Sequence, residues 1–477
     1  MSSICHADHG GNWASLPREI LILILERLVA EVTDYIHFAA VCKNWLSAVY
    51  DHYHSQQVHK KTQFLPELLL PVKTNDDESE LHRGFYNAIL DRIIFNTPQL
   101  RVPCNKRCCG SSLGWLIFTE ESLELLLFNP FSGVSIHLPQ VVIPPTQEEN
   151  NAVEDDYFYD HQYAIQKVVL SADPCKSPDN YEALALLDHS TLAFFRCGQS
   201  SWIYLKPNHL YEEVAYFDGY FYAASHASLV RFDVICLPRT SAGNAYQDQE
   251  IDVSVLPTVL IDYDRAMQGT WVHKAYLVGT PQGKILWVDR CYTFKNVEVI
   301  RDDSRRIAGY RENIEGGGGG GPINIIETMD HQFTVNFNVY EVNEDEDDDG
   351  NTEAHMRDLD ELGDDAVVFL GQNNSEMVST GDLPAEYKPR GNCIYYMDDS
   401  IHIIKEGAYY PFGAVDMGVY DLEDHSCKPL KTISGGQGGQ GKGLMPPPIW
   451  IVPQINLPPR RFHNSESAQT SSSRDQF

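Results

Sequence analysis

Basic residues are scarce in this 477-residue chain. The 36 Lys and Arg residues stand against 67 Asp and Glu, which leaves a formal net charge of −31 at pH 7. Such a surface repels phosphate backbones, so we expect no nucleic-acid partner. The chain also has no apolar run as long as a membrane span, so we expect no membrane partner. The first dozen residues lack both a basic start and an apolar core, so we expect no secretory signal.

A paired cysteine pattern is also missing. The eleven cysteines are odd in number and scattered along the chain, which suits a reducing compartment better than a disulfide framework. The basic pair at 460–461 is too short to serve as a nuclear signal. We therefore expect a protein of the nucleus, the cytoplasm or both, and not a secreted protein.

Two short patterns resemble ligand-binding loops and fail at a position that the ligand requires. Residues 436–442 follow the P-loop spacing, but Gly443 replaces the Ser or Thr that ligates Mg²⁺, and prolines at 446–448 exclude the helix that would hold phosphate. Residues 345–350 follow the start of a calcium loop, but Met356 replaces its bidentate glutamate. We interpret both stretches as flexible loops without a specific ligand.

Cysteines at 104, 108 and 109 invite a zinc interpretation. No second pair of ligands stands at usable spacing, although Cys175, Cys197 or a histidine could meet them in space. Reduced cysteines around a turn are therefore favoured. No Ser, Cys or Asp stands in a nucleophile context such as GxSxG. We find no catalytic constellation and predict a protein that is not an enzyme and that uses no metal or cofactor.

What the chain does have near its start is two apolar patterns at helical spacing. Leu16-Pro17 opens the first segment, 16–28, and proline suits the first position of a helix. The second segment, 34–49, begins at Asp34, a natural N-cap, and its apolar residues form one stripe over three turns. Both segments predict helices. The apolar positions are Ile20, Leu21, Ile24, Leu25 and Leu28 in the first and Phe38, Val41, Cys42, Trp45, Leu46 and Val49 in the second.

Two such helices bury too little surface to be stable alone. Their surplus apolar face needs either the rest of the chain or another protein. An ordinary helical hairpin packed on its own domain is therefore an alternative to a docking module. A docking module predicts that the faces of 20–28 and 41–45 stay partly exposed, and that Pro17, Ile24 and Trp45 are not all buried against the rest of the chain.

The residues of these helices also carry a family resemblance. Leu16-Pro17 followed by Glu19-Ile20, an Ile/Leu helix and "VCKNW" at 41–45 resembles the F-box, the motif that docks on the Skp-type adaptor of cullin-based ubiquitin ligases. The likeness covers 13–53, and the linker 29–33 departs from it. The resemblance implies a Skp-type adaptor, and through it cullin, as partners. The implied adaptor-binding residues are Leu16, Pro17, Ile20, Leu21, Ile24, Leu28, Val41, Cys42 and Trp45.

From about residue 85 the chain changes to short β-prone runs separated by turns. Strands are predicted at 115–118, 123–128 and 134–138, with a turn at 129–133, and Asp218-Gly219 is a strong hairpin signal. About 300 residues of such units correspond to a β-propeller of six or seven blades. A pair of β-sandwiches is the alternative.

This β-region resembles a known family too. Trp115 and the run "FNPFSGVSIHLP" at 128–139 resemble the kelch-like β-domain that follows the F-box in a large family of plant proteins. The stretches "GNCIYYMDD" at 391–399 and "GVYDLED" at 418–424 have the same texture. The implied fold is a small all-α F-box module followed by a large all-β domain.

The predicted organisation is an F-box module at 13–53, a connector at 54–84 and a kelch-like β-propeller domain at 85–455, whose first strand could begin at 64. The apolar run 449–452 is expected to pair near 64–72 or 85–95, because closing the ring removes exposed strand edges. Low-complexity and acidic stretches are expected to be flexible insertions, and the C-terminus a disordered tail. The insertions are 144–160, 301–322, 344–365 and 434–445, and the tail is 460–477.

Together these patterns predict the substrate-recognition subunit of an SCF-type ubiquitin ligase. The F-box would bind the adaptor, and the β-domain would bind the protein that is ubiquitylated. An F-box scaffold that acts without ubiquitylation is one alternative, and a propeller that senses a small molecule or acts as an enzyme is another. The target cannot be read from the sequence, because loops that bind targets on propellers carry no transferable motif.

Overall fold

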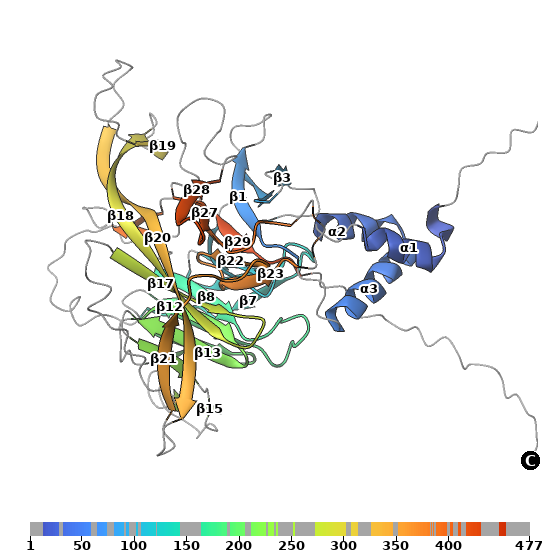
Figure 1. The fold of residues 1–477 in the computed structure, drawn as a ribbon. Coiled ribbons are helices and arrows are strands. Elements are labelled where there is room, and N and C mark those ends of the chain that lie inside the picture. Colours follow the sequence, from blue (N-terminus) through green and yellow to red (C-terminus); the bar gives the residue numbers. More distant parts are fainter. Residues whose placement is uncertain are drawn as a thin grey trace, which may run out of the picture.

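The computed structural model consists of a small helical module and a larger β-sheet domain beside it (Figure 1). Among the described helices, none has the length and apolarity to cross a membrane. The structure describes residues 13–27, 32–58, 64–73, 81–89, 92–94, 102–103, 106–120, 122–143, 164–187, 191–205, 211–225, 228–232, 235–236, 251–252, 272–301, 307–312, 326–346, 352–381, 383, 385, 388–397, 401–403, 409–411, 416–430 and 448–454.

A short 3-10 helix and three α-helices build the helical module. They are η1 (Trp13–Ser15), α1 (Arg18–Leu25), α2 (Val32–Val41) and α3 (Lys43–Val58). Pro17 was predicted at the first helical position and instead occupies the N-cap of α1, one residue before Arg18. Its φ of −54° leads into the helix without strain.

The predicted helix over 34–49 is wrong as a single element. Two helices meet at Cys42, so the apolar stripe is divided between α2 and α3. Asp34 lies in the first turn of α2 and not at its N-cap, where its carboxylate still opposes the positive end of the helix. The apolar periodicity included the buried Phe38 and Val49. It could not show the break, because helical spacing continues across a turn of one residue.

The module has a hydrophobic core of its own. Leu21 and Leu25 from α1 pack against Tyr35 and Phe38 from α2 and Val49 from α3. Burying each such side chain contributes roughly 1.5–3 kcal/mol. The Tyr35 hydroxyl lies 3.1 Å from Nδ1 of His52 inside this core, and burial lowers the pKa of the His52 imidazole.

Short antiparallel sheets make up the β-domain. The four-stranded sheets are β29-β1-β2-β3, β4–β7 and β11-β10-β9-β8, and β12–β14 form a three-stranded sheet. The next sheet is larger, in the order β21-β20-β18-β17-β23-β22-β24-β27-β28, with β19 paired to β18; β15-β16 and β25-β26 are short pairs. The strands of the first group are β1 (Glu67–Lys73), β2 (Leu81–Asn87), β3 (Arg92–Ile94), β4 (Arg107–Ser112), β5 (Trp115–Thr119), β6 (Leu125–Phe128), β7 (Ser135–Leu138), β8 (Ile165–Leu170), β9 (Glu182–Leu187), β10 (Leu192–Arg196), β11 (Ile203–Leu205), β12 (Tyr211–Phe217), β13 (Tyr220–Ser225), β14 (Ser228–Phe232), β15 (Ile235–Cys236) and β16 (Ile251–Asp252). The remaining strands are β17 (Val272–Gly279), β18 (Ile285–Arg301), β19 (Ile307–Glu312), β20 (Ile326–Glu346), β21 (Thr352–Asp358), β22 (Ala366–Leu370), β23 (Glu376–Ser379), β24 (Cys393–Tyr396), β25 (Ile401–Ile403), β26 (Tyr409–Pro411), β27 (Gly418–Asp421), β28 (Ser426–Pro429) and β29 (Ile449–Ile451).

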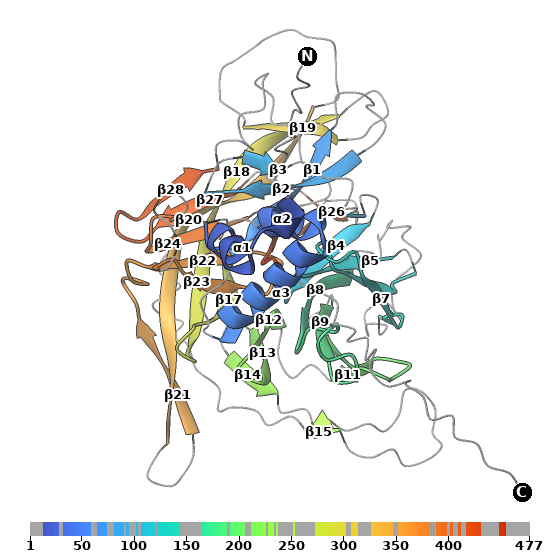
Figure 2. The same ribbon diagram turned by 90° about the vertical axis from the view of Figure 1, so that its right-hand side faces the viewer.

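Hydrophobic cores between neighbouring sheets close this series into a ring. Trp115 and Trp202 lie in the core between β4–β7 and β8–β11, and a second core joins β8–β10 to β12 and β13. Trp287 lies between β12–β14 and β17-β18, and a fourth core joins β17, β18 and β20 to β22, β24 and β27. Trp450 lies in the last core, which joins β22–β24 to β29, β1 and β2 and returns to β4–β6. Figure 2 shows the sheets following one another around a centre, with the helices in front.

The predicted ring closure is confirmed. Strand β29 pairs antiparallel with β1, in the register Leu68 to Trp450 and Leu69 to Ile449. Chain segments nearly four hundred positions apart therefore share one sheet, and the edge that either strand would otherwise expose is covered. The predicted strands over 114–139 are confirmed as β5, β6 and β7, and Asp218 and Gly219 both adopt positive φ in the hairpin between β12 and β13.

Parts of the predicted organisation are wrong. Helix α3 runs to Val58, inside the interval 54–84 that was expected to be a connector. Strand β1 and the start of β2 also lie in this interval, so the alternative in which the first strand begins near 64 is the correct one. Within the expected loop 301–322, strand β19 pairs with β18, and within the acidic stretch 344–365, strand β21 pairs with β20. The high density of charged residues led to the prediction of loops. In the structure, the long strands β18 and β20 offer an edge with which these polar segments pair. The insertions 144–160 and 434–445, the P-loop-like stretch 436–443 and the tail 460–477 lie outside the described residues.

Candidate functional site

The predicted docking residues differ in exposure. Pro17, Ile20 and Val41 are exposed, with 42% of Ile20 and 53% of Val41 accessible. Leu21 is only 2% exposed and belongs to the core of the module, so it is not part of the exposed face. Leu28 lies outside the described residues. The half-buried members of the set are Leu16, Ile24, Cys42 and Trp45.

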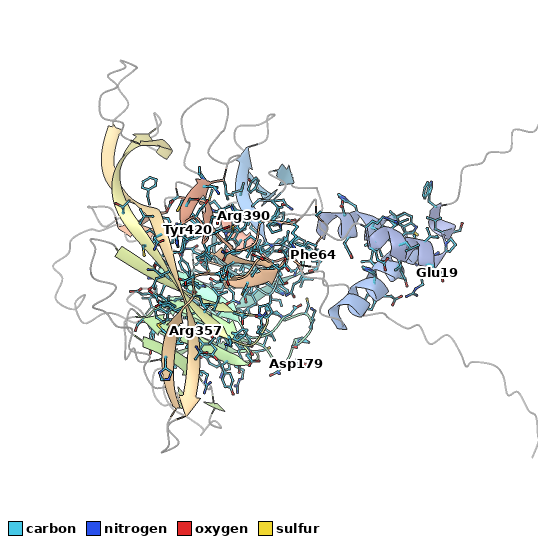
Figure 3. All side chains as sticks on the ribbon, viewed as in Figure 1. Glu19, Phe64, Asp179, Arg357, Arg390 and Tyr420 are labelled. Carbon is cyan, nitrogen blue, oxygen red and sulfur yellow. The ribbon has the colours of Figure 1, made fainter. Side chains whose placement is uncertain are left out.

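The expectation of a partly exposed module is confirmed. Pro17 is exposed, and Ile24 and Trp45 pack against the module's own core and not inside the β-domain. Figure 3 shows Glu19 of α1 on the part of the module that faces away from the β-domain, with Phe64 between the two parts. The three side chains are therefore not all buried against the β-domain, which is the outcome that would have contradicted a docking module.

Two further large apolar side chains of the module are exposed and were missed from the sequence. Trp13 is 68% exposed and Leu23 is 47% exposed. Leu23 stands three positions after Ile20, on the side of α1 away from the buried Leu21 and Leu25. We call Trp13, Pro17, Ile20, Leu23 and Val41 the apolar face; the i, i+3 spacing was the available signal for Leu23.

Trp45 has a fixed position beneath this face. Its indole Nε1 donates to the Trp13 carbonyl over 2.9 Å, and its ring lies 4.3 Å from that of Phe38 between centroids. Asn44 adds a hydrogen bond from its Nδ2 to the Ala14 carbonyl, 3.0 Å long. Both bonds fasten η1 to the start of α3, so Trp45 supports the apolar face as well as bordering it.

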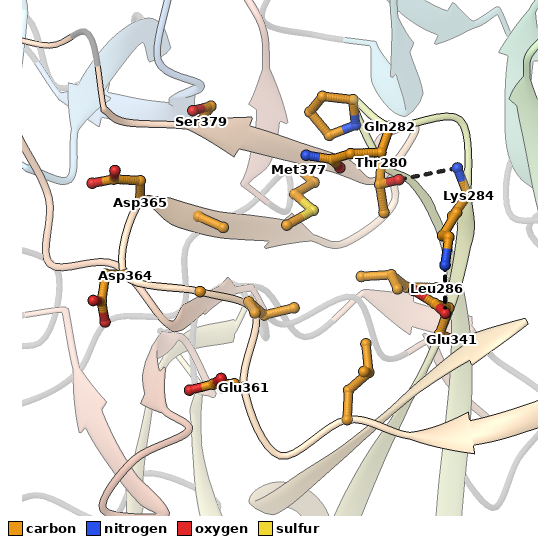
Figure 4. A pocket seen from close by; sticks show the side chains of 15 residues that line it. Thr280, Gln282, Lys284, Leu286, Glu341, Glu361, Asp364, Asp365, Met377 and Ser379 are labelled. Atoms are coloured by element: carbon orange, nitrogen blue, oxygen red, sulfur yellow. Dashed lines mark hydrogen bonds and ion pairs between the residues drawn. The ribbon is translucent and has the colours of Figure 1, made fainter.

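A pocket of about 550 Å³ opens in the β-domain, between the β17-β18 turn and the loop that leads into β22 (Figure 4). Apolar side chains of Leu286, Leu359 and Met377 line it together with carboxylates. Lys284 crosses one wall, with its Nζ 2.7 Å from Glu341 and its backbone N–H donating to the Thr280 hydroxyl. Among the described residues that line the pocket, no nucleophile contacts a base.

A fully buried arginine of the β-domain, Arg290, belongs to a structural network. Arg290 donates to Thr334 over 2.7 Å and to the Met397 carbonyl over 2.7 Å, and it lies 3.0 Å from the Asp416 carboxylate. The rings of Tyr292 and Tyr396 face its guanidinium. The network ties β18 and β20 to the segments beside β24 and β27, which explains why a charge is kept in this core.

The cysteines that suggested zinc are placed apart. Cys108 and Cys109 lie in β4, not around a turn, and point into the two different cores on either side of their sheet. They therefore cannot bind one ion together. Cys104 is outside the described residues, and within the described part of the chain no group of three side chains is arranged to hold a metal.

Both parts of the chain match models of known protein families. Residues 13–60 match the model described as F-box-like, and residues 86–421 match the model described as KIB1-4 beta-propeller. The second match covers most of the chain and nearly all of the ring of sheets. The fold is therefore a β-propeller preceded by an F-box-like helical module.

Proteins described as F-box proteins in Arabidopsis thaliana are similar to part of this chain. An F-box protein of this plant is 26% identical over 156 residues, which is 32% of this chain and 37% of the relative. An F-box/kelch-repeat protein is 30% identical over 134 residues, 28% of this chain and 33% of the relative. The chain thus matches about a third of the length of these curated relatives.

A solved structure of BBS1N in complex with ARL6DN aligns over 53% of this chain and 66% of that chain, at 9% identity. Its TM-score of 0.25 is too low to inform on function. The assignment rests on the family models and on the closed ring of sheets. The chain belongs to the KIB1-4 beta-propeller family of F-box proteins.

Proposed function

We propose that this chain is a substrate receptor of an SCF-type ubiquitin ligase. The helical module docks on a Skp-type adaptor, and the β-propeller binds the protein to be ubiquitylated. Bond formation to ubiquitin then belongs to other subunits, and this chain contributes by raising the local concentration of target lysines near the conjugating enzyme.

One observation carries the proposal: the module keeps an apolar face exposed although its own core is complete. Trp13, Ile20, Leu23 and Val41 are four large apolar side chains that the chain leaves in water. Such a patch marks a protein-binding surface. The F-box-like match at 13–60 covers the same residues and supports a Skp-type adaptor as the partner.

We propose the adaptor contacts from the same geometry. Pro17, Ile20 and Val41 make direct contacts, while Leu16, Ile24, Cys42 and Trp45 border them and shape the surface. Leu21 acts through the core of the module, and Leu28 belongs to the predicted set by sequence alone. Trp13 and Leu23 join the direct contacts, because both are exposed and Leu23 stands three positions after Ile20 on α1.

Adaptor binding tests the docking step. Val41→Asp places a carboxylate in the interface and should weaken binding of the purified Skp-type adaptor at least about tenfold, since an unpaired buried charge costs several kcal/mol. Val134→Asp is the matched control, because Val134 is an exposed valine of the β-domain. Equal binding by both variants would refute docking through this face.

A scaffold that acts without ubiquitylation shares the docking step and differs afterwards. Proximity labelling with the wild-type chain beside a variant lacking 13–60 identifies the partners. If the abundance of those partners rises when cullin or the proteasome is inhibited, the receptor function is supported. If abundance does not respond, the scaffold is the better description. We place this function in the nucleus, the cytoplasm or both.

A further inference from the structure

The loop at 358–365 forms one wall of the pocket and is unusually acidic. Its sequence DLDELGDD holds five carboxylates and no cation. Glu361, Asp364 and Asp365 line the pocket, with Glu341 on the opposite side. Figure 4 shows the carboxylates of Glu361, Asp364 and Asp365 on one side and Lys284 with Glu341 on the other.

This acidic wall is held in place by hydrogen bonds to its surroundings. The backbone N–H of Leu359 donates to the Val339 carbonyl over 2.8 Å, and that of Leu362 donates to the Asn392 side chain over 2.8 Å. At the other end, the N–H of Thr380 donates to the Asp365 carbonyl over 2.7 Å. The pocket therefore exists before a ligand arrives, which lowers the entropy cost of binding.

The charges of the pocket are only partly balanced. Glu341 pairs with Lys284 at 2.7 Å and with Arg357 at 3.2 Å, and Asp365 pairs with Lys388 at 2.5 Å. Within the described part of the chain, Glu361 and Asp364 have no ion-pair partner. Two exposed carboxylates thus border the pocket with their charge available to a cation from outside.

The apolar lining of the pocket sets a second requirement, which is that the ligand also has apolar surface. Leu286 is buried, and Leu359, Leu362 and Met377 are half-buried against the same core. A small free cation would leave these apolar side chains in contact with water. A Lys or Arg side chain satisfies both, because its aliphatic stem covers apolar surface while its head reaches the carboxylates.

We propose that this pocket binds a basic, aliphatic peptide segment of the target, with a Lys or Arg side chain facing Glu361 and Asp364 and a neighbouring aliphatic side chain on Leu359, Leu362 and Met377. The proposal rests on the proposed receptor function and names the class of target for it. The excess of acidic residues over the whole chain draws such segments toward the propeller.

A peptide-binding experiment tests the ligand class with the full-length chain alone. A positional-scanning set of fluorescein-labelled nonapeptides, varied among Lys, Arg, Leu, Gln, Glu and Ser, is measured by fluorescence polarisation. Peptides with Lys or Arg next to Leu should bind best, and replacing the basic residue by Gln should weaken binding about tenfold, as expected for loss of a charge-assisted contact.

Paired variants locate the site. Glu361→Gln/Asp364→Asn should weaken the best peptide about tenfold or more, because both carboxylates facing the cation are lost. Asp358→Asn/Asp360→Asn changes the same loop by the same charge at positions that do not line the pocket, and should stay within about twofold. If both double variants weaken peptide binding equally, the peptide responds to the overall negative charge of the loop, and the proposal that it binds in this pocket is wrong.

Two other results would overturn the inference and leave the receptor function standing. One is a full-length chain that binds the adaptor and shows no preference for basic over neutral peptides. The other is a preference for acidic peptides, which the acidic wall excludes. Failure of adaptor docking would instead refute the receptor function, and the peptide measurement does not depend on it.

Discussion

The ring of Phe131 stacks on that of Phe85, with centroids 5.8 Å apart and planes inclined by 24°. Phe131 stands in the turn between β6 and β7 and also packs against the core of the helical module. Asn129 holds this turn, since its side-chain oxygen accepts from the Phe131 N–H over 3.0 Å. From the module side, Tyr35 packs edge-on against Phe64, 5.4 Å away. Aromatic contacts therefore join the docking module to the propeller.

Phe131→Ala should loosen the orientation of the module relative to the propeller. The half-buried ring makes the cost to stability about 1–2 kcal/mol, below the 3–5 kcal/mol of a fully buried Phe. Spin labels carried by non-natural residues at the exposed positions Glu19 and Asp179 would measure the distance distribution, which should broaden. Tyr220→Ala, an exposed aromatic in the propeller, should leave it unchanged. An equally narrow distribution for Phe131→Ala would contradict the role of this contact.

Two buried tryptophans should respond differently to replacement by phenylalanine. Trp115 and Trp450 are both fully buried, but Trp115 Nε1 donates to Asp173 over 2.9 Å, whereas Trp450 Nε1 has no acceptor among the described residues. Trp115→Phe loses this bond to a buried carboxylate and should cost about 1–3 kcal/mol more than Trp450→Phe. Urea unfolding of the two variants provides the comparison, and equal midpoints would show that the bond contributes nothing net.

The ion pair between Lys167 of β8 and Glu213 of β12 should be costly to break from one side. Both side chains are buried, so Lys167→Met leaves a buried carboxylate and should cost about 3–5 kcal/mol. Adding Glu213→Leu removes that charge and should recover much of the loss. Lys388→Met, which breaks the exposed pair with Asp365, should stay within about 1 kcal/mol. A double variant as unstable as Lys167→Met would contradict this account.

Glu376 of β23 should make stability depend on pH. Burial raises the pKa of its carboxyl from 4.5 to about 7. Between these values the folded chain binds more protons than the unfolded chain, so the free energy of unfolding falls as pH rises from about 4.5 to about 7. Glu376→Gln should flatten this slope and should be more stable than the wild type at pH 8. Urea unfolding from pH 5 to pH 8 measures the free energy of unfolding and its slope against pH. The exposed Glu361→Gln is the control and should keep the slope of the wild type. An unchanged slope in Glu376→Gln would show that Glu376 does not cause the pH dependence.

Local patterns in the sequence were sufficient for many elements. Short apolar runs bounded by turn residues predicted β5 to β7, and Asp218-Gly219 predicted its hairpin, because both signals act between neighbours in the chain. The strand β4, with Cys108 and Cys109, was missed. Its small and polar residues have little strand propensity, and burial between two cores holds them extended.

The candidate docking face was predicted in part. Helical spacing and the F-box resemblance identified Pro17, Ile20 and Val41, which are exposed as expected. They could not separate these from Leu21, because an apolar residue in a short helix looks the same whether it faces the module's core or a partner. Trp13 lies before the predicted helices, and its place beside α3 depends on the bond from Trp45.

The sequence by itself determined the two-part architecture, because helical spacing, strand-forming runs and the residues of short motifs are local properties of the chain. Only the tertiary structure decided which apolar residues stay in water, how Phe131 joins the two parts, and that an acidic stretch expected as a loose loop forms a strand and a pocket wall. Those outcomes depend on contacts between segments far apart in the chain. Examples are the pairing of β29 with β1 and the hydrogen bond from the Leu362 N–H to the Asn392 side chain. Burial is a property of the assembled sheets, and no stretch of residues specifies it alone.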